Sequence, residues 1–194
     1  EVSRLASYIK SPDLAIETAC RELDDGRSVM ILTTCAYMLT RLLGQLREQG
    51  VPFGNRYRVK RGDWNPLAEH GMTAARRLLA FAEFRTQQTA KALQAWAEHC
   101  RSDGLFRRGG KARLAEYEQV DQQALRELFA DEATWQAALS GDVNWFLGHL
   151  LASKVGSYVY PARVLYRKGP DHLRRKPRLT VGTIHSVKGG EADV

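Results

Sequence analysis

The residues with the most evident chemistry lie in the last fifteen positions of the chain, 180–194. A short apolar run that ends at Ile184 is followed by a polar turn, which clusters His185, Ser186, Lys188, two glycines and Glu191. Phosphate binding is the first chemistry to test for such a turn, because glycine lets a ligand approach the backbone closely. A strand that begins after Glu191 needs partners, so we expect this chain to be an excised segment of a longer protein.

The turn only partly matches the phosphate loop G-x-x-x-x-G-K-[ST] of nucleotide-binding proteins. Val187 stands where that loop needs a glycine for backbone contact with the phosphate, and Gly189 replaces the hydroxyl that binds magnesium. The sequence therefore excludes a phosphate loop of this type at residues 182–189, and no other segment supplies one.

The same residues resemble motif V of the UvrD/Rep-like superfamily 1 DNA helicases, whose pattern is approximately T-[IL]-H-x-[AS]-K-G-[LG]-E. The pattern stands at residues 183–191, where Thr183, His185, Lys188, Gly189 and Glu191 all match in one unbroken register. The resemblance implies that Thr183, His185 and Ser186 contact the DNA strand. It also implies that Lys188, Gly190 and Glu191 belong to the ATP site. The alternative is a turn between two strands whose polar residues are incidental.

A second resemblance to these helicases lies upstream. Residues 29–37, followed by leucines at 42, 43 and 46 and by Gly50-Val51-Pro52-Phe53, resemble motif IV, in which a strand leads to a helix and then to a G-[IV]-P-[FY] turn. Many members carry a Tyr-Arg pair after that strand, whereas this chain has Thr33 and Thr34, which offer neither a stacking ring nor a guanidinium group. Tyr37 and Arg41, one helical turn further on, are candidates to replace the pair in binding ATP.

The elements that position these motifs follow from the spacing of apolar residues. The pattern predicts a helix over 2–25 with a break at 11–13, a buried strand at 29–32, and a second helix that closes at Gly50. Residues 51–53 could start another strand. A strand-like run returns only at residues 179–184. This alternation is typical of a parallel sheet.

Between these parts the apolar residues recur at helical spacing. We therefore predict an α/β fold, a partial RecA-like parallel sheet domain interrupted by an all-helical inserted domain. Its three parts are residues 1–55 (the motif IV region), 56–177 (the helical insertion) and 178–194 (the motif V region). We expect Trp96, Trp135, Trp145, His99 and His149 to pack in the insertion. Trp64 is a packing residue or, as an alternative, a stacking platform.

Basic residues gather in two places. One cluster (Arg107, Arg108, Lys111 and Arg113) flanks a glycine turn, and the other (Arg167, Lys168, His172, Arg174, Arg175, Lys176 and Arg178) precedes the second strand. Such clusters neutralise phosphates or serve as solvated connectors. We expect Arg174, Arg175 and Lys176 to contact DNA.

Composition narrows the class of protein further. The net charge is +7 and the pI is about 9.5, which favours an anionic partner. The three cysteines form neither a ligand pattern nor a disulfide framework, so we predict no metal site and a cytoplasmic location. No apolar run approaches the roughly 18 residues of a membrane span, so no membrane partner is expected.

The resemblance implies part of an ATP-dependent DNA helicase that moves on single-stranded or partially duplex DNA. ATP and Mg²⁺ would be its cofactors, and the missing N-terminal RecA-like domain of the same protein would be its partner. No catalytic set is complete in this chain, so we expect it to be inactive alone. Two alternatives stay open: a non-catalytic nucleic-acid-binding module that retains a helicase-like turn, and a helical protein-docking platform.

Overall fold

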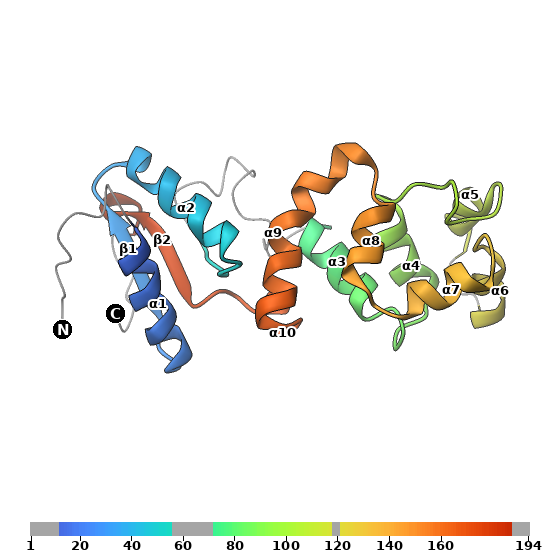
Figure 1. Ribbon diagram of the computed structural model, residues 1–194, viewed down its shortest axis with the longest axis horizontal. Coiled ribbons are helices and arrows are strands. Elements are labelled where there is room, and N and C mark those ends of the chain that lie inside the picture. The colour runs from blue at the N-terminus through green and yellow to red at the C-terminus, as the bar shows by residue number, and fades with distance from the viewer. Residues whose placement is uncertain (1–11, 56–71, 118–120, 188–194) are drawn as a thin grey trace. The chain divides into compact units, whose positions relative to one another are not determined.

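The computed structural model describes residues 12–55, 72–117 and 121–187, and these residues form two compact units. The first unit comprises residues 1–69 and 163–194, and the second comprises residues 70–162. The first unit contains a two-stranded parallel sheet with helices, whereas the described residues of the second unit form helices and turns (Figure 1). The prediction of a mixed α/β chain with parallel strands is therefore confirmed.

The sheet of the first unit joins two segments that are far apart in the sequence. Strand β1 (Val29–Thr33) pairs in parallel with β2 (Leu179–Thr183), and the register places Val29 opposite Leu179 and Thr33 opposite Thr183. Leu179 and Val181 are fully buried. The two apolar runs that predicted strands thus form neighbouring strands of one sheet.

The expected further strand at residues 51–53 does not form as a regular strand. Instead Gly54 makes an isolated parallel bridge with Thr180, in which its amide donates to the carbonyl of Leu179 (2.8 Å) and its carbonyl accepts from the amide of Val181 (2.7 Å). Pro52 lacks an amide hydrogen, so this short segment cannot donate at every position of a ladder. Strand β2 is therefore bonded along both of its edges.

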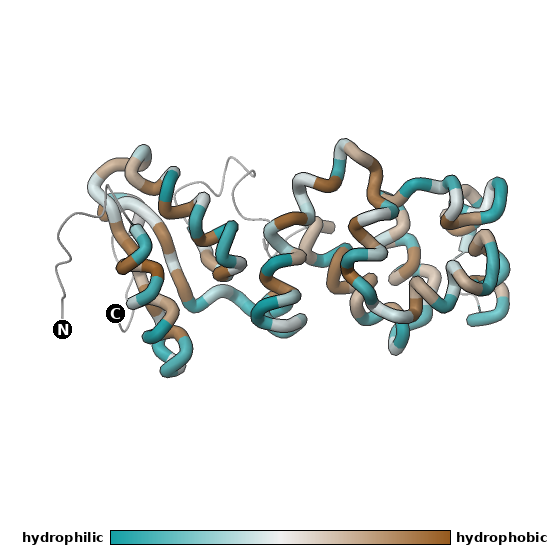
Figure 2. The backbone as a smooth tube through the Cα atoms, in the orientation of Figure 1, coloured by the Kyte–Doolittle hydropathy of each residue, from teal (hydrophilic) through white to brown (hydrophobic). Residues whose placement is uncertain are grey.

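Two helices complete the core of the first unit. Helix α1 (Asp13–Asp24) contacts β1, and it also contacts helix α2 (Leu39–Glu48), which follows the short 3₁₀ helix η1 (Ala36–Met38). The predicted helix over 2–25 begins at Asp13 in the described part of the chain, and residues 2–11 lie outside that part. Apolar residues recur along α1 and α2 (Figure 2), and among them Ile16, Leu42 and Leu46 are buried.

The second unit is built from short helices around an aromatic core. Its helices are α3 (Ala74–Ala82), α4 (Ala90–Ala97), α5 (Gly110–Leu114), α6 (Gln122–Glu127), α7 (Glu132–Leu139), α8 (Val143–His149) and the first part of α9 (Ala152–Lys168). Side chains of Thr73, Thr89, Asp121, Asp131 and Asp142 cap the helices that follow them, which satisfies amides that would otherwise be unpaired.

The core of the second unit confirms the expected positions of the tryptophans. Trp96 is fully buried, Trp135 is 5% exposed, and Trp145 stacks on Phe81 with ring centroids 5.9 Å apart. Phe81 also stacks on Phe146 at 4.7 Å. Aromatic rings of this size supply most of the apolar area that such a small helical unit buries.

The chain returns to the first unit within α9. Residues from Arg163 onward belong to that unit, and α9 is followed by the short helix α10 (Asp171–Arg174) and then by β2. The sequence pattern places the end of the helical insertion later, at residue 177. We refer below to residues 163–178, which connect the boundary of the units to β2, as the basic segment.

Candidate nucleic-acid interface

The carboxyl ends of β1 and β2 lie together at one edge of the sheet. They meet because the strands are parallel and end in the same register, with Thr33 opposite Thr183. In open α/β sheets, ligands bind in the crevice beyond the carboxyl ends of the strands. The predicted site residues of the motif V and motif IV regions follow directly after these two ends.

At the end of β2 the structure describes part of the predicted motif. Thr183 is 5% exposed, whereas Ile184 and His185, which begin the 3₁₀ helix η3 (Ile184–Val187), are exposed to solvent. Ser186 lies within η3. His185 is therefore a polar side chain of the motif that is open to a ligand. The predicted ATP-site residues Lys188, Gly190 and Glu191 lie outside the described residues.

At the end of β1 the two threonines make local hydrogen bonds. The Thr33 hydroxyl donates to the carbonyl of Cys35 (3.0 Å), and the Thr34 hydroxyl contacts the sulfur of Met38 (3.4 Å). These contacts shape the turn that starts η1. Beyond this turn, Tyr37 is 73% exposed and Arg41 is exposed on α2, so both candidate ATP-binding side chains are open to solvent.

Some cations of the basic segment bind other parts of the first unit, and others are open to solvent. Arg167 donates to the carbonyl of Gln49 (2.7 Å), Arg178 donates to the carbonyl of Leu23 (2.7 Å), and Lys168 pairs with Asp24 (3.4 Å). These three side chains hold the basic segment against α1 and α2.

The predicted DNA-binding residues lie at the end of α10 and directly after it. Arg174 pairs with Asp171 at 2.9 Å. The side chains of Arg175 and Lys176 are exposed, and neither side chain makes a hydrogen bond or ion pair with any residue that the structure describes. Of the predicted cations, these two are the most available to an external phosphate.

The other basic cluster lies in the second unit, and it too contains both cations that bind carbonyls of the chain and cations that are exposed. Arg107 Nε donates to the carbonyl of Phe129 (3.1 Å), and Lys111 Nζ donates to the carbonyls of Glu98 (3.1 Å) and Cys100 (2.7 Å). The remaining two cations of the cluster, at positions 108 and 113, are exposed. Arg107 and Lys111 are therefore structural residues.

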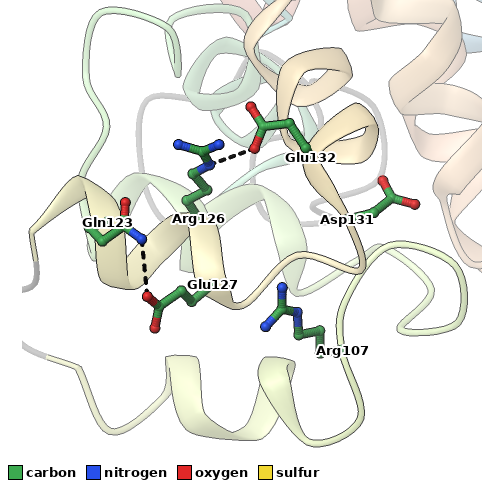
Figure 3. A pocket seen from close by; sticks show the side chains of 6 residues that line it. All are labelled: Arg107, Gln123, Arg126, Glu127, Asp131 and Glu132. Atoms are coloured by element: carbon green, nitrogen blue, oxygen red, sulfur yellow. Dashed lines mark hydrogen bonds and ion pairs between the residues drawn. The ribbon is translucent and has the colours of Figure 1, made fainter.

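A cavity of about 320 Å³ in the second unit has no counterpart among the sequence predictions (Figure 3). The residues that line it are polar or charged, and they are Arg107, Gln123, Arg126, Glu127, Asp131 and Glu132. Arg126 pairs with Glu132 at 2.5 Å, and Gln123 donates to Glu127 at 3.1 Å. Hydrogen bonds from Thr134, led by that from its amide, lower the pKa of Asp131. The polar groups of this cavity are paired with one another or with Phe129 and Thr134, so it offers no dedicated anion site.

Titratable groups outside these surfaces have structural roles. Burial raises the pKa of the Cys100 thiol to about 12, so this cysteine is an inert packing residue. His149 Nδ1 lies 2.8 Å from the carbonyl of Trp145, and His99 Nδ1 lies 2.9 Å from the Tyr158 hydroxyl. Both histidines pack as predicted. Within the described ranges, no three His, Cys, Asp or Glu side chains are grouped so as to hold a metal ion.

Comparisons with other proteins do not identify the chain. No protein-family model, no curated protein and no solved structure matches it. Among the described residues, no helix is both long enough and apolar enough to cross a membrane.

Proposed function

We propose that this chain is part of the second RecA-like domain, with its helical insertion, of a UvrD/Rep-like superfamily 1 DNA helicase. The observation that carries the proposal is the motif V match within residues 183–191, which begins at Thr183, the last residue of a strand that is paired in parallel with β1. The complete enzyme would couple ATP hydrolysis to movement on single-stranded DNA, with ATP and Mg²⁺ as cofactors.

The proposed mechanism uses the edge of the sheet described above. His185, exposed at the start of η3, would contact the DNA strand, while Thr183 and Ser186 complete that side of the turn. Lys188, Gly190 and Glu191 would face the ATP, together with Tyr37 and Arg41. A turn that touches both ligands can transmit domain closure on ATP to the bound strand. The missing N-terminal RecA-like domain would supply the phosphate loop.

Binding of single-stranded DNA by the chain tests the proposed turn. We expect His185→Ala to weaken binding about fivefold to tenfold, which corresponds to the loss of about one hydrogen bond. The matched control is Thr40→Ala, since Thr40 is a neutral, exposed residue of the first unit that lies on α2, outside both the motif V turn and the basic segment. Fluorescence anisotropy across a salt series measures both variants. Unchanged affinity of His185→Ala, or equal losses in the two variants, would remove the turn from the DNA site.

A non-catalytic nucleic-acid-binding module is the second candidate. The observation that favours it is the pair Thr33 and Thr34, whose hydroxyls are used in a local turn and cannot replace the stacking ring and guanidinium group of the helicases. The flanking reading frame separates the two proposals. The helicase requires G-x-x-x-x-G-K-[ST] upstream and an arginine-bearing motif downstream, and the module requires neither.

A further inference from the structure

Tyr166 is an aromatic side chain that the fold leaves in solvent. It is 88% exposed, more than any other large hydrophobic residue that the structure describes. It belongs to the last part of α9, within the first unit. None of the buried aromatic contacts of the second unit involves this residue, so its ring is open to an external partner.

The segment that carries Tyr166 also carries nearly all of the excess charge of the protein. Residues 163–178 include seven lysines and arginines and one aspartate, a net charge of +6, whereas the whole chain carries +7. The other residues together are therefore close to neutral. A surface that combines concentrated positive charge with an exposed ring fits a polyanion with aromatic bases, which is a nucleic acid.

The backbone at Tyr166 is held firmly. Arg163 and Arg167, three residues before and one residue after it, donate to the carbonyls of Arg47 (3.5 Å) and Gln49 (2.7 Å) at the end of α2. Each guanidinium group has five donors and uses one here, so charge and donors remain for a phosphate. A ring on a fixed helix loses little conformational entropy when it binds a ligand.

We propose that Tyr166 is a base-stacking residue and that the basic segment binds single-stranded nucleic acid in preference to duplex. Stacking on one ring requires an unstacked base, which a single strand offers and a duplex does not. The cations supply a contact that is independent of sequence, and the exposed side chains of Arg175 and Lys176 have no hydrogen bond or ion pair with a described residue. This inference rests on the proposed function for its ligand class, but it assigns a further binding surface, on α9 and α10, in addition to the turn after β2.

The test compares Tyr166→Ala with Tyr166→Phe in the whole chain. The probes are an oligothymidylate, an abasic oligomer of the same length and a duplex, each titrated across a salt series. We expect Tyr166→Ala to weaken oligothymidylate binding about tenfold or more, while Tyr166→Phe, which keeps the ring, stays within about twofold of the wild type. The dependence on salt should not change, because no charge is removed. Affinity for the abasic oligomer and the duplex should be the same in all three proteins.

Two results overturn the inference. One is wild-type affinity of Tyr166→Ala for oligothymidylate, and the other is an equal loss for the oligothymidylate, the abasic oligomer and the duplex. Thermal unfolding of Tyr166→Ala should match that of the wild type, since the side chain is 88% exposed. If His185→Ala weakens binding and Tyr166→Ala does not, only this inference fails. If Tyr166→Ala weakens binding and His185→Ala does not, the proposed turn fails and the stacking residue remains.

Discussion

At the scale of single residues, Gly50 is where α2 meets α9 within the first unit. Its φ of +62° lies in the left-handed region, which side chains disfavour. A Cβ atom at this position would lie 2.9 Å from the backbone carbonyl carbon and oxygen of Arg163. These backbone atoms belong to a helix and cannot rotate away as a side chain would, so glycine is required both by conformation and by space.

We expect Gly50→Ala to lower the free energy of unfolding of the first unit by at least about 2 kcal/mol, because left-handed strain and the backbone clash add. Gly44→Ala is the matched control. Gly44 lies inside α2, and a Cβ there would meet no atom within 4 Å, so alanine should stabilise the helix by about 0.5–1 kcal/mol. Urea denaturation measures both variants. Equal effects would show that the contact with Arg163 is not required.

At the scale of elements, the end of α4 is stabilised by cations from its neighbours. Arg77 of α3 donates to the carbonyl of Ala95 (2.5 Å) and pairs with Glu98 (2.6 Å). Lys111 of α5 donates to the carbonyls of Glu98 and Cys100. The last carbonyls of a helix have no partner within it, and positive charge is favourable there. Contacts of this kind join three short helices that would be unstable separately.

His99 follows this helix end, and its environment makes the stability of the second unit depend on pH. Burial, then the positive charges of Arg77 and Lys154, lower the pKa of His99 below its usual 6.5. The unfolded chain therefore takes up a proton at a higher pH than the folded unit does. The contribution of neutral His99 to the stability of the folded second unit is therefore complete above a pH of about 6.5. It is lost as the pH falls through the lower pKa of the folded state.

We accordingly expect the urea concentration at the unfolding midpoint of the second unit to decrease as the pH is lowered from about 7.5 to about 5. In His99→Gln, which cannot titrate, that decrease should be smaller. An identical pH dependence in the two proteins would show that His99 does not cause it.

At the scale of the whole molecule, the positive charge is concentrated in residues 163–178, so net charge alone is a poor guide to where a polyanion binds. We expect replacement of Arg175 and Lys176 by alanine to lower the slope of log K against log salt for single-stranded DNA by about 1.4, or about 0.7 for each phosphate contact. The control replaces Arg108 and Arg113, two exposed cations of the second unit, and removes the same charge. Equal slopes in the two double variants would indicate a general charge effect without a defined surface.

Much of the fold could be predicted because its signals are local. The apolar runs at 29–32 and 179–184 predicted the two strands, and helical spacing in the middle of the chain predicted the helical second unit. Buried Trp96 and Trp135 follow from the same periodicity. The expected strand at 51–53 is reduced to one bridge at Gly54, because Pro52 lacks the amide hydrogen that a regular ladder would need. The motif V assignment stays a prediction.

The strand and helix periods, the excess of positive charge and the polar turn after β2 can be read from the amino-acid sequence, since all of these depend on neighbouring residues. Which cations bind other parts of the chain and which stay free for a ligand depends on the folded chain. The partners of Arg167 and Arg178 are carbonyls 118 and 155 residues away along the chain. Only folding brings those carbonyls within hydrogen-bonding distance, and the same folding leaves Arg175, Lys176 and Tyr166 facing solvent.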